Sequence, residues 1–580
     1  MKSLDEVLAH LHDGTLAGST LVDLDLRARD LSGAKLAGVA WVRVKLDGAR
    51  LDGADLRDAR FDQCPLDGAS LRGATLVGAR LRGCSLQGTV LDAADCTRAS
   101  LQEVTAPRLS LRDAVLADTV WTASTLDETT FAQADLTGLR FDRASLRGAR
   151  FPAARLHRAS FVEARLDGAD LGTSDLTDAV LLGAHLCGAR LAGCTFGQTQ
   201  LTRADLRGAT LPRHLGRAVL ADVALSDADA PDRAPLGHAP MAWAGRTLDG
   251  CVLQGVCLDG ADFTGASLEG ATLARCTLRG ASLGAAVLTR AVFTGCDLAG
   301  ARFADASLTM TVWAECDLTG ADFTAARFAN ASLVQCTLRG ALLVDASLAD
   351  TTLTGTALDG VALDGARLRG IDLDGLDLRG LALAGLALRY CAFVGATLSG
   401  LDLRRCDLTG SDFTRAALED CRLDDATLTW ANLRGAKLAR ASLRRVHARG
   451  ADCSGVTATH TVWTDAVVDR TTFTDAVLEA CNLERVSAVG ARFERAVLAR
   501  SDLRGARLRD ADLSHAHLED VLLAGADLTR AVLHNVYDAG ALYDGATLRG
   551  VTRTDLVRLE AEAWKAPTAL REAMLGLGDD

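Results

Sequence analysis

The sequence predicts an all-β solenoid, a stack of coils built from five-residue units, with a short helix at each end. A bulky apolar residue returns at every fifth position over almost the whole chain, and a small residue stands two positions before it. A period of five matches neither an amphipathic helix nor an alternating strand. It fits a coil in which each quintet forms one side and then turns a corner, with the bulky and small residues pointing inward. All 15 Phe, from Phe61 to Phe493, occupy the bulky position, which supports this register.

The composition agrees with a narrow aliphatic core. The 580 residues are 49% hydrophobic but only 4% aromatic. A solenoid grows by adding units rather than by enlarging one core, so this length does not imply several ordinary domains. The formal net charge of −12 disfavours broad contact with phosphates, and DNA binding is not expected.

The sixteen cysteines raise the question whether the protein belongs to an oxidising or a reducing compartment. The stretch Met1–Glu6 carries acids where a signal peptide needs an apolar run. No run of 18 apolar residues occurs, so no membrane span is expected. Free, buried thiols in a reducing cytoplasm are therefore the predicted state.

Residues 1–14 are predicted to form an N-terminal capping helix. Ser3 and Glu6 have the spacing of a capping box. One face of this helix is apolar and consists of Leu4, Val7, Leu8 and Leu11. The helix would cover the open end of the solenoid, because terminal repeats must hide a bare apolar cross-section.

Residues 19–227 are predicted to form a first array of quintets, with a distorted coil around 101–126, where Pro107 loosens the pattern. A Pro-containing linker or loop is expected at 228–246, and a second array at 247–552. The second register weakens at Ala448, Cys453 and Ala458. Two hinged rods and one continuous rod with a loop both remain open.

Residues 553–580 are predicted to form a helical cap, with Thr554 as the N-cap of a first helix and Pro567 opening a second. The apolar residues expected over the final coil are Leu556, Leu559, Ala563 and Trp564. The competing role for this segment is dimerisation, so the predicted state is a monomer or an end-to-end dimer.

The quintets resemble the pentapeptide-repeat family, whose pattern is A(D/N)Lxx. Residues that match the pattern include Ala54-Asp55-Leu56, Ala134-Asp135-Leu136, Ala204-Asp205-Leu206, Ala431-Asn432-Leu433 and Ala526-Asp527-Leu528. The resemblance implies a right-handed quadrilateral β-helix with four quintets, or 20 residues, per coil. A hexapeptide left-handed β-helix is excluded because its period is six.

No residue set predicts catalysis, a cofactor or a metal. The cysteines Cys276, Cys296, Cys316 and Cys336 are spaced by 20 and would form one inward column. A line of sulfurs cannot surround a tetrahedral ion, so core packing is the preferred interpretation. The eleven His show no ligand spacing, and His515 and His517 are expected to point outward. A filled solenoid offers no catalytic pocket, and the protein is predicted not to be an enzyme.

Residues 401–450 contain the one clearly basic segment, with ten Lys or Arg against seven Asp or Glu. Arginine pairs and an aspartate pair alternate there at a spacing of 20, which favours a structural charge ladder. The functional alternative is a patch for a partner, with these candidate residues: Arg404, Arg405, Arg415, Arg422, Arg434, Lys437, Arg440, Arg444 and Arg445.

The function predicted from these observations is a non-enzymatic scaffold that binds an unknown protein partner along its faces. The family resemblance implies a second hypothesis, a DNA mimic that binds or protects DNA gyrase or a related topoisomerase. Duplex DNA carries about one charge per 1.7 Å, far more than a net −12 supplies over a chain of this length. A third hypothesis, also from the family, is an accessory or delivered protein of a bacterial secretion system.

Overall fold

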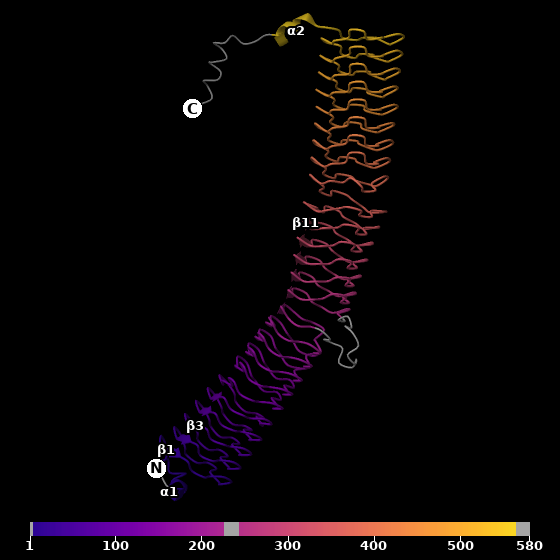
Figure 1. The fold of residues 1–580 in the computed structure, drawn as a ribbon. Coiled ribbons are helices and arrows are strands. Elements are labelled where there is room, and N and C mark those ends of the chain that lie inside the picture. Colours follow the sequence, from indigo (N-terminus) through magenta and orange to yellow (C-terminus); the bar gives the residue numbers. More distant parts are fainter. Residues whose placement is uncertain (1–3, 226–242, 564–580) are drawn as a thin grey trace, which may run out of the picture. The chain divides into compact units, whose positions relative to one another are not determined.

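The structure is a computed structural model that describes residues 4–225 and 243–563. The chain forms two compact units, Met1–Asp322 and Phe323–Asp580, and each is a stack of flat coils (Figure 1). This confirms the predicted fold class, an all-β quadrilateral β-helix with a short helix at each end.

Regular secondary structure is sparse because most sides of a coil are single β-bridges between turns. The two helices are α1 (Leu4–Ala9) and α2 (Leu556–Ala563). The strands of the first unit are β1 (Thr20–Val22), β2 (Ala40–Val42), β3 (Arg60–Asp62), β4 (Arg80–Arg82), β5 (Ser100–Gln102), β6 (Val219–Ala221), β7 (Val252–Gln254), β8 (Thr272–Ala274), β9 (Val292–Thr294) and β10 (Val312–Ala314). The second unit contains β11 (Ser332–Val334).

The parallel pairing shows directly that one coil contains 20 residues. In the register of β1, β2 and β3, Leu21 lies opposite Trp41, and Trp41 lies opposite Phe61. The same offset joins the isolated bridges, for example Asn432 with Asp452. Identical quintet positions therefore stack in columns, as the repeat predicts.

The core follows the two inward positions of each quintet. Phe393 and Phe413 stack at 4.6 Å between ring centroids, and Phe473 and Phe493 stack at 4.9 Å. Cys276, Cys296 and Cys316 of the first unit are buried, as is Cys336 of the second. The interior is thus filled by apolar side chains and thiols, which supports core packing for these cysteines.

The first unit continues across the predicted linker. Strands β6 and β7 pair in parallel, with Leu220 opposite Leu253. The Arg246 side chain strengthens this junction, because its Nη1 donates hydrogen bonds to the carbonyl oxygens of Leu211 (3.0 Å) and Pro212 (2.8 Å). Most of the predicted linker lies outside the described residues, and the predicted domain boundaries stay predictions.

Helix α1 begins the first unit. Val7 and Leu11 are buried, and the Leu11 carbonyl accepts a hydrogen bond from Lys35 N (2.8 Å). These contacts place the helical segment against the first coils, as expected for a cap. Ser3 of the predicted capping box lies outside the described residues.

The second unit contains a seam where successive coils are not joined. No backbone hydrogen bond links residues 356–369 to residues 377–388, both of which lie in the described part of the chain. Branched side chains replace the usual small inward residue here, namely Val361, Ile371, Leu376, Leu381 and Leu386. A purely aliphatic cavity of about 20 Å³ lies inside. Overfilled inward positions force the coils apart, which explains the lost pairing.

Two sequence expectations about coil regularity have mixed outcomes. Ala448 and Cys453 remain buried in bridged coils, because Val446 and Val456 enlarge the neighbouring inward positions. Around 101–126 most inward residues are buried too, but Ala114 is only half-buried, and neither Leu111 N nor Leu116 N forms a backbone hydrogen bond within the described chain. The predicted distortion is therefore present in the hydrogen bonding and at one inward position.

Helix α2 differs from the predicted cap in two respects. Its N-cap is Asp555, whose Oδ1 accepts from Val557 N (3.0 Å), while Thr554 Oγ1 accepts from Asn535 N. No residue of α2 is buried, and Leu556 is 69% exposed, so the expected packing of its apolar residues over the final coil is wrong. Trp564 and the predicted second helix lie outside the described residues.

Candidate functional site

The structure distributes the predicted arginine patch over three sides of the second unit. We name the sides by the quintets of one coil: side A is 401–405, side B 406–410, side C 411–415 and side D 416–420, each repeating every 20 residues. Side A carries Arg404, Arg405, Arg422, Arg444 and Arg445; side C carries Arg415 and Arg434; side D carries Lys437 and Arg440. Because sides A and C are not adjacent, the nine residues do not form one surface.

Side A is a charge ladder as much as a basic surface. Arg404 pairs with Asp402 at 2.5 Å, and Arg445 pairs with Asp425 at 2.7 Å. The hydrogen bonds from Arg404 lower the pKa of Asp402 to about 2. These ion pairs neutralise much of the positive charge of side A within the protein.

Sides C and D contain both paired and unpaired charges. Arg440 pairs with Asp420 at 2.6 Å, and Arg434 approaches Asp452 at 3.8 Å. Neither Arg415 nor Lys437 has an ion pair among the residues that the structure describes. The sequence alone could not separate these cases, because the direction of a long side chain depends on the neighbouring coil.

Side B holds an exposed aromatic column that the sequence reasoning missed. The Trp430 side chain is 65% exposed, and that of Tyr390 is 56% exposed. Each ring lies over the glycine one coil further, Trp430 over Gly450 and Tyr390 over Gly410. The signal in the sequence was an aromatic residue at the fifth quintet position, outside the bulky register.

Basic groups surround this column. The Arg369 guanidinium lies 5.6 Å from the centroid of the Tyr390 ring, within the range of a cation–π contact. Arg449 precedes Gly450 on the same side, and no ion pair of its guanidinium exists in the described chain. Side B thus combines exposed rings with available positive charge.

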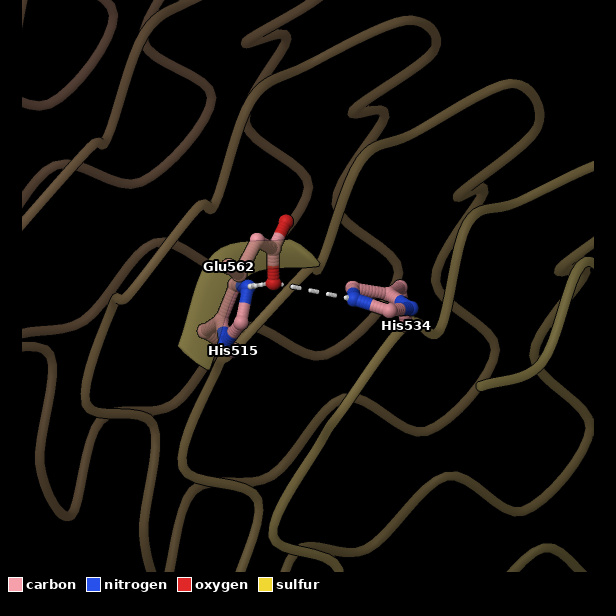
Figure 2. A group of neighbouring side chains, drawn as sticks. All are labelled: His515, His534 and Glu562. Atoms are coloured by element: carbon pink, nitrogen blue, oxygen red, sulfur yellow. Dashed lines mark hydrogen bonds and ion pairs between the residues drawn. The ribbon is translucent and has the colours of Figure 1, made fainter. Parts of the chain in front are cut away.

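A second cluster forms where α2 meets the last coils. His515 and His534 stand on side C in successive coils, and Glu562 reaches them from α2 (Figure 2). Glu562 Oε2 lies 3.0 Å from His515 Nε2 and 3.2 Å from His534 Nε2. Two imidazoles and one carboxylate oxygen therefore converge on one point.

The burial of this cluster shows how α2 docks. Ser514 and His534 occupy the position after a bulky residue, where side chains of neighbouring coils are partly exposed. Here both are 1% exposed, because α2 covers them. The helix therefore packs on side C through polar contacts and not through its apolar residues.

Further hydrogen bonds orient each member of the cluster. Arg558 Nε donates to Glu562 Oε1 at 2.7 Å, and this contact is the main cause that lowers the pKa of Glu562. Asn535 Nδ2 lies 3.0 Å from His515 Nδ1. The backbone N–H of Asp555 donates to His534 Nδ1 at 3.1 Å.

The sequence reasoning missed this cluster, although half of its signal was present. His515 and His534 are 19 residues apart, one less than a coil, which places them side by side in a 20-residue repeat. Glu562 follows no repeat, because its position depends on how the helix leaves the last coil.

The periodic columns agree with the comparison to known families. The sequence pattern of the family described as pentapeptide repeats matches residues 25–63, 69–105, 140–178, 174–208, 247–284, 271–309, 301–340, 341–380, 426–462, 476–514 and 506–537, and a second pattern of the same description matches residues 393–437. The matched residues make up well over half of the chain. The protein belongs to the pentapeptide-repeat family.

Solved structures of pentapeptide-repeat proteins match parts of the chain. HetL from the cyanobacterium Nostoc, involved in heterocyst differentiation regulation, is 23% identical over 43% of this chain and 90% of HetL, with a TM-score of 0.19. QnrB1, a plasmid-mediated fluoroquinolone resistance protein, is 21% identical over 35% of this chain and 98% of its own, with a TM-score of 0.18. A protein of the Arabidopsis thaliana thylakoid lumen is 31% identical over 19% and 74%, with a TM-score of 0.17.

No curated protein matches the chain. Within residues 4–225 and 243–563, neither helix has the length and apolar character needed to cross a membrane.

Proposed function

We propose that the protein is a non-enzymatic scaffold that binds a protein partner on the faces of its coils. The observation that carries this proposal is the column on side B, where Trp430 and Tyr390 are exposed beside Arg449. Tryptophan, tyrosine and arginine are the residue types that dominate binding energy at protein interfaces. Because the ring of Trp430 already lies on Gly450, it loses little conformational freedom when a partner covers it.

The filled interior supports a binding role over catalysis. The aliphatic cavity at the seam offers no polar group, whereas a catalytic pocket needs convergent polar side chains. The outward positions can vary without disturbing the core, which suits a scaffold whose partner is specified by its surface.

The alternative of a DNA mimic gains no support from the acidic columns. Aspartates on the outward positions are paired with arginine one coil further, for example Asp420 with Arg440, Asp475 with Arg495, and Asp510 with Arg530. A mimic needs a continuous negative stripe, and these pairs interrupt it. No contact in the described chain bears on the secretion-system alternative.

The proposal is tested with a photo-crosslinking amino acid placed at Trp430, with the matched control at Thr457 on side D. In lysate of the source organism, we expect one stoichiometric adduct from position 430 that is absent from position 457. Equal or absent crosslinking at both positions would contradict the proposal. Inhibition of gyrase supercoiling by micromolar protein would favour the DNA-mimic alternative instead.

A further inference from the structure

We propose that His515, His534 and Glu562 bind one divalent transition-metal ion of the Zn²⁺ type, which fastens α2 to side C. This proposal departs from the expectation from sequence that no metal ligands are present. It is independent of the proposed scaffold function, since it lies at the end of the second unit and away from the column of Trp430.

Two of the three separations between the ligand atoms already match what such an ion requires. Zn–N and Zn–O bonds are about 2.0–2.1 Å, so neighbouring ligands of a tetrahedral ion lie about 3.3 Å apart. Glu562 Oε2 is 3.0 Å from His515 Nε2 and 3.2 Å from His534 Nε2. All three atoms lie within 4.8 Å of one another, and a water molecule would supply the fourth ligand.

The chemistry of the donors also suits this class of ion. Imidazole nitrogen with a carboxylate oxygen is a common zinc ligand set. Arg558 holds Glu562 Oε1, which leaves Oε2 directed at the two imidazoles (Figure 2). Asn535 contacts His515 Nδ1, and after rotation of the amide its side-chain oxygen can accept a hydrogen bond from Nδ1–H. Such outer contacts orient ligands in metal sites.

Coordination requires a tautomer change at both histidines: at His515 it accompanies the rotation of the Asn535 amide, and at His534 it affects the contact with Asp555. The Asp555 N–H donates to His534 Nδ1, so the proton of the neutral ring is on Nε2, from which it is donated to Glu562. A ligand nitrogen must be unprotonated. The proton therefore moves to Nδ1 when the ion binds, and the hydrogen bond from Asp555 is given up. The hydrogen bond from Asp555 and the two contacts of the imidazoles with Glu562 Oε2 are given up while three coordination bonds form, and the N-terminus of α2 has to shift.

Without an ion, the same three residues form a hydrogen-bonded clasp between α2 and side C. The two states make different predictions. If the three residues form only a clasp, α2 docks equally well with or without Zn²⁺. If they coordinate an ion, the protection of the α2 amides against hydrogen exchange depends on Zn²⁺.

The binding experiment uses the tag-free, full-length chain with Cys187→Ser and Cys257→Ser, which removes the two cysteines that are not buried. Zn²⁺ is titrated in competition with a chromogenic chelator. We expect one ion per chain, and we expect Glu562→Gln and His534→Gln each to weaken binding about 10-fold or more. His460→Gln, which removes an exposed histidine on side D, is the matched control and should bind like the parent.

Hydrogen exchange of residues 556–563 supplies the second readout. Zn²⁺ should slow exchange in the parent and not in Glu562→Gln, and EDTA should reverse the effect. If the parent binds no stoichiometric Zn²⁺, or if Glu562→Gln binds it equally well, the proposal is wrong. The titration of the parent decides the question even if a variant fails to fold, which circular dichroism would reveal.

Discussion

Trp430 occupies a corner of its coil where the backbone has a φ of 60°, a conformation that costs an ordinary L-residue about 1–2 kcal/mol. The corner directs its ring over Gly450, which lacks the Cβ that would collide with it. The exposed ring is thus held by a residue of the next coil, and the glycine has a packing role besides its conformational one.

Gly450→Ala should test this role. The new Cβ would lie 2.5 Å from the Trp430 ring, so the ring must move. The substitution would also strain the backbone. We expect a larger loss of urea stability than for Gly455→Ala, which has a similar φ of 63° but open space around its Cβ. In a Trp430→Ala background the two substitutions should cost the same, and a persistent difference would contradict the packing role.

Arginine two positions after an aspartate lowers the carboxyl pKa to about 2 at four places. The unfolded value is about 3.9. Because the folded pKa is the lower one, these groups stabilise the fold above pH 4, and that contribution is lost as the pH falls towards 2. The pairs are Asp25 with Arg27, Asp205 with Arg207, Asp377 with Arg379, and Asp402 with Arg404.

We therefore expect the urea midpoint to fall between pH 4 and pH 2, and to fall less steeply when the four arginines are changed to glutamine. The control variant carries four Arg→Gln changes at arginines without an ion pair in the described chain, so that net charge is matched. Those positions are Arg203, Arg415, Arg449 and Arg470. An equal slope in both variants would show that the pairs do not control the pH response.

At the scale of the element, the seam shows that the repeat does not tolerate a run of large residues at the small inward position, although a single one such as Leu401 is accommodated. Ala448 and Cys453 replace bulky residues and leave the ladder intact. Leu376 and Leu381 replace small residues, and the ladder is lost. A small residue leaves space that a neighbour fills, whereas a large one raises the height of the coil itself.

Amide exchange should expose the seam. The amides of Leu358, Leu363 and Leu368 lack their partners in the next coil, so we expect faster exchange over 358–368 than over 438–448. The second peptide is the same part of a coil four coils later, and its amides are bonded, for example Leu438 N to Thr457 O at 2.7 Å. Equal rates in the two peptides would mean that the coils close in solution.

At the scale of the whole molecule, the last coil is the weakest end of the second unit. Leu548 is 38% exposed at a bulky inward position, whereas its equivalents Leu528 and Leu508 in inner coils are buried. Helix α2 docks on side C through its polar residues and leaves this end uncovered. The cap was predicted at 553–580, and for residues 564–580 it stays a prediction.

Truncation after Ala563 should reveal what the terminal segment does. If residues 564–580 cover the last coil, we expect the shortened chain to self-associate or to lose thermal stability, because apolar residues would become accessible. Light scattering and thermal unfolding measure both effects against the full chain. An unchanged mass and melting temperature would contradict the cap, and a dimer that dissociates on truncation would support the dimerisation alternative.

The repeat allowed the fold to be predicted down to the coil length and the inward placement of single side chains. Every Phe was placed inward from its quintet position, and the 20-residue coil is confirmed by Leu21 opposite Trp41. The candidate surfaces were harder to predict from the repeat. The arginines of 401–450 lie on three sides, and the side that carries Trp430 was not considered at all.

The sequence by itself determined the inward half of this protein, because burial of an apolar side chain in a repeat depends only on its place in the quintet. The tertiary structure alone decided which outward groups meet. Glu562 reaches His515 and His534 because α2 turns back onto side C. Outward contacts depend on the path of the chain between coils and at its ends, and no five-residue pattern encodes that path.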